Sequence, residues 1–171
     1  MMARRRDRKP ILKAPRTLRA DFLNLHDAFL NTSLQRSRML RSPMEGITNP
    51  EEFFRSDRGR FERTYVAFLA ALVEAWEAKR AAPVRSFMAA QAPTAGLAAT
   101  VDDELTLARR SGGLDKLRCI RGYMFHRDER EYWDAGRVAV AELGGVHERL
   151  YWAFSRLFLA AFREVPREAW P

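Results

Sequence analysis

Apolar residues of this chain return every three or four positions, which is the spacing of one face of an α-helix. The clearest case runs from about Gly59 to Lys79, where large apolar side chains form one continuous stripe. Its members are Phe61, Tyr65, Phe68, Leu72 and Trp76, and Leu69 and Val73 widen it. No stretch of the sequence alternates apolar and polar residues for long enough to predict a strand. The spacing therefore predicts an all-α protein with Trp76 in its core.

The same spacing, together with capping signals, predicts the helices on either side of this stripe. One helix should cover residues 17–40. Asn49 followed by Pro50 should start the helical stretch that contains the stripe, because Asn is a common N-cap and Pro suits the first turn. Pro83 can open a short helix, after which the small residues 93–99 should form a loop.

The second half of the chain should hold three more helical pieces. Thr100 with Asp103 three residues later has the form of a capping box that opens a helix ending near Arg110. Residues 114–125 and 146–162 should form the last two helices. The final helix should turn Leu150, Phe154, Leu157, Phe158 and Phe162 toward the core. A single bundle of four to six helices is the natural way to bury these faces.

The length and the charge distribution predict one domain with a basic arm. A chain of 171 residues, 47% of them hydrophobic, has the size and composition of one domain with its own core. Residues 1–16 carry +6 of the net charge of +8, so we expect an arm over 1–16 and a helical-bundle domain over 17–171. Such an arm can bind phosphate backbones or remain a solvated tail. Its candidate nucleic-acid-binding residues are Arg4, Arg5, Arg6, Arg8 and Lys9.

Several other classes of protein do not fit the sequence. The longest apolar run, residues 66–73, is far short of the roughly 20 residues that cross a bilayer. The charged N-terminus has no apolar stretch behind it, so we expect a cytoplasmic protein without a membrane span. Cys119 alone can make neither an internal disulfide nor a thiolate cage. His26, His126 and His147 lie far apart, so we expect no metal and no other cofactor.

Arg121 and His126 are the residues that can best carry chemistry together. A guanidinium stays charged and offers a planar fork of donors to phosphate, and an imidazole exchanges protons near neutral pH. On an unbroken helix five positions correspond to about 140° around the axis, so the two side chains would not meet on one phosphate. We therefore expect the helix to end or loosen between Arg121 and His126, where Gly122 lowers the helical preference, or a two-fold dimer to bring two such helices together. An arginine-rich helix end closed by a histidine is the structural alternative.

The segment from Arg121 to His126, of sequence RGYMFH, resembles the R-x4-6-H signature of the HEPN family. Proteins of that family are dimeric helical bundles that carry this motif late in the chain before a long final helix, and many are metal-independent RNases. The resemblance implies that Arg121 and His126 are catalytic and that RNA is cleaved by transesterification. Arg118 and Arg127 could then hold flanking phosphates, and Tyr123 or Trp133 could stack on a base.

The resemblance also bears on partners and regulation. It implies a homodimer, an RNA substrate and a role for a protein partner or antitoxin, in a toxin or defence context. Gly122 stands where the family commonly has a polar residue, and Asp128 stands where nucleotidyl-modified members have tyrosine, so we do not expect that modification.

Two other functions stay open. The main alternative is a non-catalytic helical interaction module whose arm contacts nucleic acid. A further one is a DNA-binding regulator with a helix-turn-helix near residues 100–110.

Overall fold

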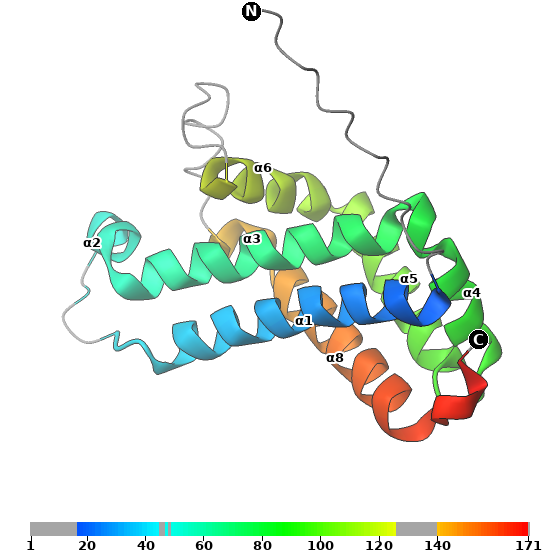
Figure 1. Ribbon diagram of the computed structural model, residues 1–171. Helices are drawn as coiled ribbons and strands as arrows, with labels where there is room; N and C mark the ends of the chain where they lie inside the picture. The colour runs from blue at the N-terminus through cyan, green and yellow to red at the C-terminus, as the bar shows by residue number, and fades with distance from the viewer. Residues whose placement is uncertain (1–16, 45–46, 48, 126–139, 171) are drawn as a thin grey trace, which may run out of the picture.

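The computed structural model describes residues 17–44, 47, 49–125 and 140–170, and these form an all-α structure without strands (Figure 1). Six helices of nine or more residues pack as a single bundle, which confirms the predicted fold class. Their bounds are α1 Leu18–Arg41, α3 Asp57–Glu77, α4 Ala82–Ala90, α5 Ala95–Arg110, α6 Gly113–Phe125 and α8 Val146–Glu164. The shorter elements are α2 Pro50–Arg55, η1 Lys79–Ala81, η2 Val140–Leu143 and η3 Arg167–Ala169.

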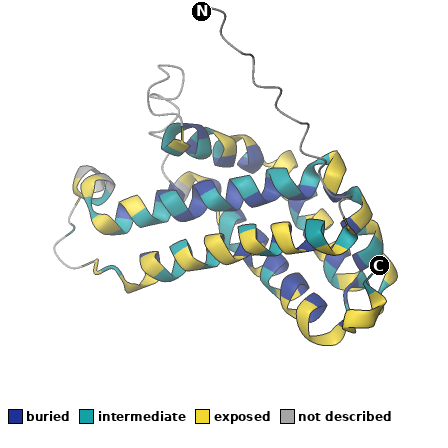
Figure 2. Cartoon of the chain, in the orientation of Figure 1, coloured by how far each residue is buried: buried dark blue, intermediate teal, exposed yellow. Residues whose placement is uncertain are grey.

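Helix α3 is the central element of the bundle. It packs between α1 and α6, while α8 packs against α5 on the other side of the core (Figure 1). The inward positions of the predicted stripe are buried, whereas Phe61 and Phe68 are partly exposed at its edge (Figure 2). The Trp76 indole meets the ring of Phe154 edge to face at 5.6 Å, and both side chains are fully buried. The predicted core positions of Trp76 and Phe154 are thereby confirmed.

The helical stretch that begins after Asn49 is divided into two helices. The Asn49 carboxamide oxygen accepts a hydrogen bond from the Glu52 amide at 2.9 Å, as the capping signal predicts. At Ser56 the backbone becomes extended, and the Ser56 hydroxyl accepts from the Gly59 amide at 3.0 Å and so caps α3. A Cβ at Gly59 would lie 2.0 Å from the Phe53 carbonyl oxygen, so only glycine permits this close approach of α2 to α3.

Helix α5 begins earlier than the sequence predicts. Its first residue is Ala95, so the expected loop over residues 93–99 and the expected cap at Thr100 are wrong. The Thr100 hydroxyl instead donates to the Gly96 carbonyl oxygen at 2.9 Å inside the helix. Ala98 is buried and lengthens the apolar face of α5 by one turn. Alanine has the highest helix propensity, and this burial outweighs the capping pattern.

The last helix differs from its prediction at one position. Leu150, Phe154, Leu157 and Phe158 are buried as expected. Phe162, however, is 56% exposed, so its expected core position is wrong. It lies in the last turns of α8, where its ring is tilted by 37° against that of Phe22 of α1, with 6.0 Å between the ring centroids.

Candidate functional site

Arg121 lies near the C-terminal end of α6, against the last turns of α3. Its guanidinium forms an ion pair with the Glu74 carboxylate, with 3.4 Å between Nη2 and Oε2, and its side chain is 32% exposed. Its Nε is buried and has no hydrogen-bond partner among the described residues. Helix α6 continues through the buried Gly122 to Phe125, so it does not loosen at Gly122 itself, and the last step to His126, where the helix could still end, lies outside the described residues.

The other predicted site residues are placed only in part. Arg118 lies on α6 one turn before Arg121, and Tyr123 is half-buried on the same helix. The remaining predicted residues lie outside the described part of the chain: His126, Arg127, Trp133 and the arm residues Arg4, Arg5, Arg6, Arg8 and Lys9.

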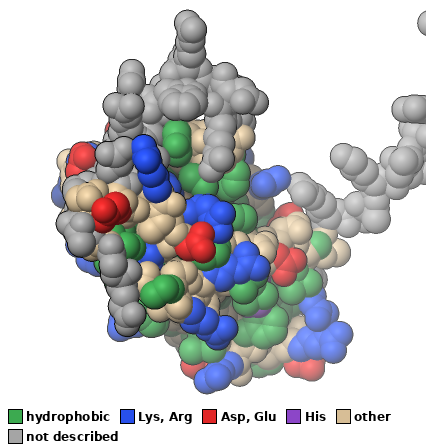
Figure 3. Space-filling view, turned by 90° about the vertical axis from the view of Figure 1, so that its left-hand side faces the viewer, with side chains coloured by type: hydrophobic (Ala, Val, Ile, Leu, Met, Phe, Trp, Pro, Cys, Tyr) green, Lys and Arg blue, Asp and Glu red, His purple; other side chains and the backbone are tan. Residues whose placement is uncertain are grey.

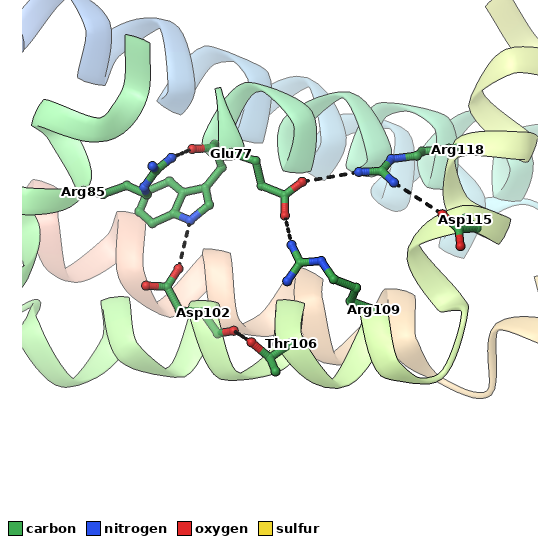
Figure 4. A network of polar contacts seen from close by, with 8 residues as sticks. Glu77, Arg85, Asp102, Thr106, Arg109, Asp115 and Arg118 are labelled. Atoms are coloured by element: carbon green, nitrogen blue, oxygen red, sulfur yellow. Dashed lines mark hydrogen bonds and ion pairs between the residues drawn. The ribbon is translucent and has the colours of Figure 1, made fainter. Parts of the chain in front are cut away.

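The fold adds a third arginine that the sequence analysis did not single out. Arg109, in the last turn of α5, donates to the Glu77 carboxylate at 2.5 Å, and Arg118 approaches the other oxygen of Glu77 at 3.6 Å (Figure 4). Arg118 also contacts Asp115, one turn earlier on α6, at 3.3 Å. We call Arg109, Arg118 and Arg121 the arginine cluster. Only the packing of α5 and α6 onto α3 brings these three residues together.

The arginine cluster is balanced in charge but rich in donors. Its three guanidiniums face three carboxylates, those of Glu74, Glu77 and Asp115. Each guanidinium has five N–H donors, and its ion pairs occupy only some of them. About half or more of the Arg109 and Arg118 side chains is exposed. The cluster can therefore donate several hydrogen bonds to phosphate oxygens, in competition with its own carboxylates.

A polar cleft continues from the arginine cluster between α3, α4 and α5. It has a volume of about 580 Å³, and Glu77, Arg85, Asp102 and Arg109 are among its lining residues. The Trp76 indole nitrogen donates to the Asp102 carboxylate at 3.4 Å, and Arg85 donates to the Trp76 carbonyl oxygen (Figure 4). The cleft lets solvent and a ligand reach the side of the cluster formed by Arg109.

The end of the bundle where α6 stops carries mixed groups. Figure 3 views this end directly, and Lys and Arg side chains are spread over it with acidic and hydrophobic groups between them. Phe125, the last residue of α6, is half-exposed and meets Phe68 of α3 edge to face at 5.6 Å. Arg121 and Phe125 are four positions apart, so they share one face of α6.

A second polar group, which the sequence did not reveal, joins α1 and α8. Arg36 donates to the Glu148 carboxylate at 2.9 Å, and its guanidinium lies over the rings of Tyr151 and Trp152 at 4.6 and 5.1 Å. Burial alone would lower the pKa of Arg36, but the hydrogen bond and charge of Glu148 raise it. Burial also lowers the pKa of His147, against the opposing charge of Glu148. The ion pair and the stacking of the guanidinium on the two rings hold α1 against α8.

The two described histidines are both shielded from water. The His26 ring lies 4.5 Å from the Phe162 ring and 5.9 Å from the Phe158 ring, and burial lowers its pKa against the opposing charge of Asp27. Within the described ranges, no three His, Cys, Asp or Glu residues gather closely enough to hold a metal ion. None of the described helices is long and apolar enough to cross a membrane.

Comparisons with protein-family models, with curated proteins and with solved structures found no match to this chain.

Proposed function

We propose that this protein is a metal-independent endoribonuclease that cleaves RNA by transesterification, with Arg121 and His126 as its catalytic residues. The observation that carries the proposal is the arginine cluster. It presents three partly exposed guanidiniums around Arg121, and those of Arg118 and Arg109 share the Glu77 carboxylate. Several donors at one place suit a polymer of phosphates better than a single neutral ligand.

The reaction needs proton transfer and stabilisation of charge. The ribose 2′-oxygen loses its proton and bonds to the adjacent phosphorus, and the 5′-oxygen leaves with a proton, which yields a 2′,3′-cyclic phosphate and a 5′-hydroxyl end. His126 transfers protons, a role that typically contributes about 10²–10⁴ in rate. Arg121 donates to the oxygens that gain negative charge in the transition state.

The continuous α6 helix favours a two-fold homodimer for this chemistry. Helix α6 has no bend at Gly122 and remains helical to Phe125. A bend at Gly122 therefore cannot bring Arg121 and His126 of one copy onto one phosphate. Two copies whose α6 ends face each other could offer the arginine of one copy and the histidine of the other to one phosphate. The half-exposed Phe125 supplies apolar surface at this end of the helix.

The test is cleavage of a labelled single-stranded RNA by the purified full chain in excess chelator. Wild-type protein should release products with a 2′,3′-cyclic phosphate. Arg121→Ala should lower the rate by about 10²–10³, by analogy with loss of an oxyanion donor, and His126→Ala by about 10²–10⁴. Arg60→Ala is the matched control, because Arg60 is an exposed arginine of α3 paired only with Asp57 among the described residues.

The circular dichroism spectrum of each variant should match that of the wild type. Intact RNA after incubation with folded wild-type protein would refute the proposal, and so would equal cleavage by all variants. Deleting residues 1–14 tests the basic arm separately, since losing phosphate contacts should flatten the salt dependence of RNA binding.

A non-catalytic interaction module is the second candidate. Exposed hydrophobic side chains of α1 and α8, Leu30, Leu34, Trp152 and Leu159 among them, favour it because exposed apolar side chains on neighbouring helices suit a protein partner. This candidate takes the place of the nuclease if RNA stays intact.

A further inference from the structure

An apolar groove runs between α1 and α8, and the arginine cluster is separated from it by α3. The groove has a volume of about 310 Å³. Buried Phe29 and Phe158, stacked at 5.2 Å, form its floor, and Leu30, Leu159 and Phe162 form its walls. The wall residues are 49%, 50% and 56% exposed. We call this feature the α1–α8 groove.

The two helices that form the groove run in opposite directions. Phe29 of α1 stacks on Tyr151 near the start of α8, and Phe22, two turns earlier on α1, lies beside Phe162 near the end of α8. The furrow between them is short, since its lining runs from His26 to Leu30 on α1 and from Ser155 to Arg163 on α8. Such a furrow fits the side chains of a third helix placed at positions i, i+3 or i+4 and i+7.

The exposed apolar surface extends beyond the groove along both helices. On α8 the outward positions Trp152, Arg156, Leu159 and Arg163 follow each other at alternating steps of four and three residues. On α1 Leu23, Leu30 and Leu34 continue the same surface. Scattered single hydrophobics are common on protein surfaces, but exposed apolar side chains that gather around one apolar groove on two neighbouring helices favour an interaction site.

The charges at the α8 edge of this surface are basic. Arg163 lines the groove, and Arg156 lies two turns earlier on the same side of α8. Among the described residues neither arginine has an ion-pair partner. Asp27 is the acidic residue on the outward side of α1 in this stretch. A partner would therefore gain electrostatic attraction from carboxylates beside its apolar row.

We infer that the α1–α8 groove binds an amphipathic helix with acidic flanks, contributed by another protein. Its apolar row fills the furrow between Leu30 and Leu159, and its carboxylates reach Arg156 and Arg163. The inference is independent of the proposed nuclease function, because α3 separates the groove from the arginine cluster.

Other occupants fit less well. In a two-fold pairing of α8 with α8 of a second copy, Arg156 and Arg163 of both copies would enter one interface, where like charges repel. RNA would find Phe162 beside Leu30 and Leu159 on the groove walls rather than a row of exposed aromatic platforms. A lipid bilayer presents a broad surface, so it would cover the groove without filling it, whereas a single helix can lie in the groove.

The experiment uses the full chain and a synthetic probe peptide of about 20 residues that forms a helix with leucines on one face and glutamates on both flanks. Binding is measured by fluorescence anisotropy of a neutral dye on the peptide. One control peptide has the same composition with its leucines scattered, and another carries lysine in place of each glutamate. The acidic amphipathic peptide should bind at least about tenfold more tightly than either control peptide.

Four protein variants locate the binding site. Leu30→Ser and Leu159→Ser should each weaken binding by about tenfold, since both side chains would anchor the peptide. Arg163→Glu should also weaken binding and should reduce its salt dependence. Leu107→Ser is the matched control, because Leu107 is an equally exposed leucine of α5 outside the groove, and it should bind like the wild type. All four variants should keep the wild-type melting temperature within a few degrees, because the replaced side chains are exposed.

Several outcomes would overturn the inference. Equal affinity for the three peptides would do so, as would wild-type affinity in both serine variants. Sedimentation of the wild type as a dimer that Leu159→Ser dissociates would assign the groove to a second copy. Binding of the wild type, but not of Leu159→Ser, to anionic phospholipid vesicles would assign it to a membrane surface. Loss of RNA cleavage would leave these results unchanged, so the two proposals fail separately.

Discussion

Replacing Glu74 by Gln should tighten RNA binding if Arg121 contacts phosphate. The substitution keeps the length and shape of the side chain but removes the negative charge that lies 3.4 Å from the Arg121 guanidinium. Two unit charges at this distance interact by about 1.2 kcal/mol in bulk water and about 5 kcal/mol at an effective dielectric constant of 20. Both side chains are about one-third exposed, so the smaller value is the better guide.

The expected gain follows from this comparison. Measured partly exposed ion pairs are worth about 0.2–1 kcal/mol, so removing the competing carboxylate should raise the affinity for RNA by at most about fivefold. Arg121→Gln should lower the affinity and should make the salt dependence shallower by about 0.7 logarithmic units per decade, the value for one phosphate contact on a single strand.

The assay is fluorescence anisotropy with a labelled single-stranded RNA whose 2′-oxygens are methylated, because this RNA cannot undergo transesterification. Asp57→Asn is the matched control: it makes the same change in net charge on the same helix, at an exposed pair with Arg60. The reasoning is refuted if Asp57→Asn tightens binding as much as Glu74→Gln does. It is also refuted if Glu74→Gln weakens binding, since the carboxylate would then serve to position Arg121.

Three further predictions concern stability. Phe154→Ala should lower the free energy of unfolding by about 3–5 kcal/mol in a denaturant titration, because it empties a fully buried site beside Trp76, and a loss below about 1 kcal/mol would contradict this packing. Gly59→Ala should lower the melting temperature, because its Cβ would overlap the Phe53 carbonyl oxygen, whereas Gly96→Ala, with open space around it in α5, should gain up to about 1 kcal/mol from helix propensity. Equal effects of the two glycine substitutions would argue against the close approach of α2 and α3. Glu62→Gln should stabilise the protein at neutral pH, because burial raises the pKa of Glu62 above its ordinary value of 4.5. The folded state then binds the proton of Glu62 more tightly than the unfolded state does. The stability of the wild type therefore falls as pH rises from about 4.5 through the folded pKa. Thermal unfolding of both proteins across this range should show the difference growing with pH, and a constant difference would exclude the titration of Glu62 as its source.

The amino-acid sequence determined most of the helical architecture. The core position of Trp76, the cap at Asn49 and the face of the last helix as far as Phe158 were predicted correctly, because burial of an apolar face and capping of the first turn depend on neighbours three or four positions away. The start of α5 was predicted wrongly, because a capping pattern and an apolar face there indicate different first residues. The pattern at Thr100 has the form of a cap, but burial of Ala98 against the bundle continued α5 through it.

The candidate site was only half visible in the sequence. Arg121 and Arg118 could be selected because a guanidinium near a histidine has an evident use with phosphate. Their partners could not be predicted, since Glu74 and Glu77 lie on α3 more than 40 positions earlier and Arg109 lies on another helix. The α1–α8 groove could not be predicted from the sequence either. Helical periodicity predicts that Phe162 faces the core, but the core does not extend over its ring near the end of α8, and Phe162 is therefore exposed. Spacing along one helix states which side chains share a face, but the order in which helices pack decides which faces meet, and that order depends on contacts between distant parts of the chain.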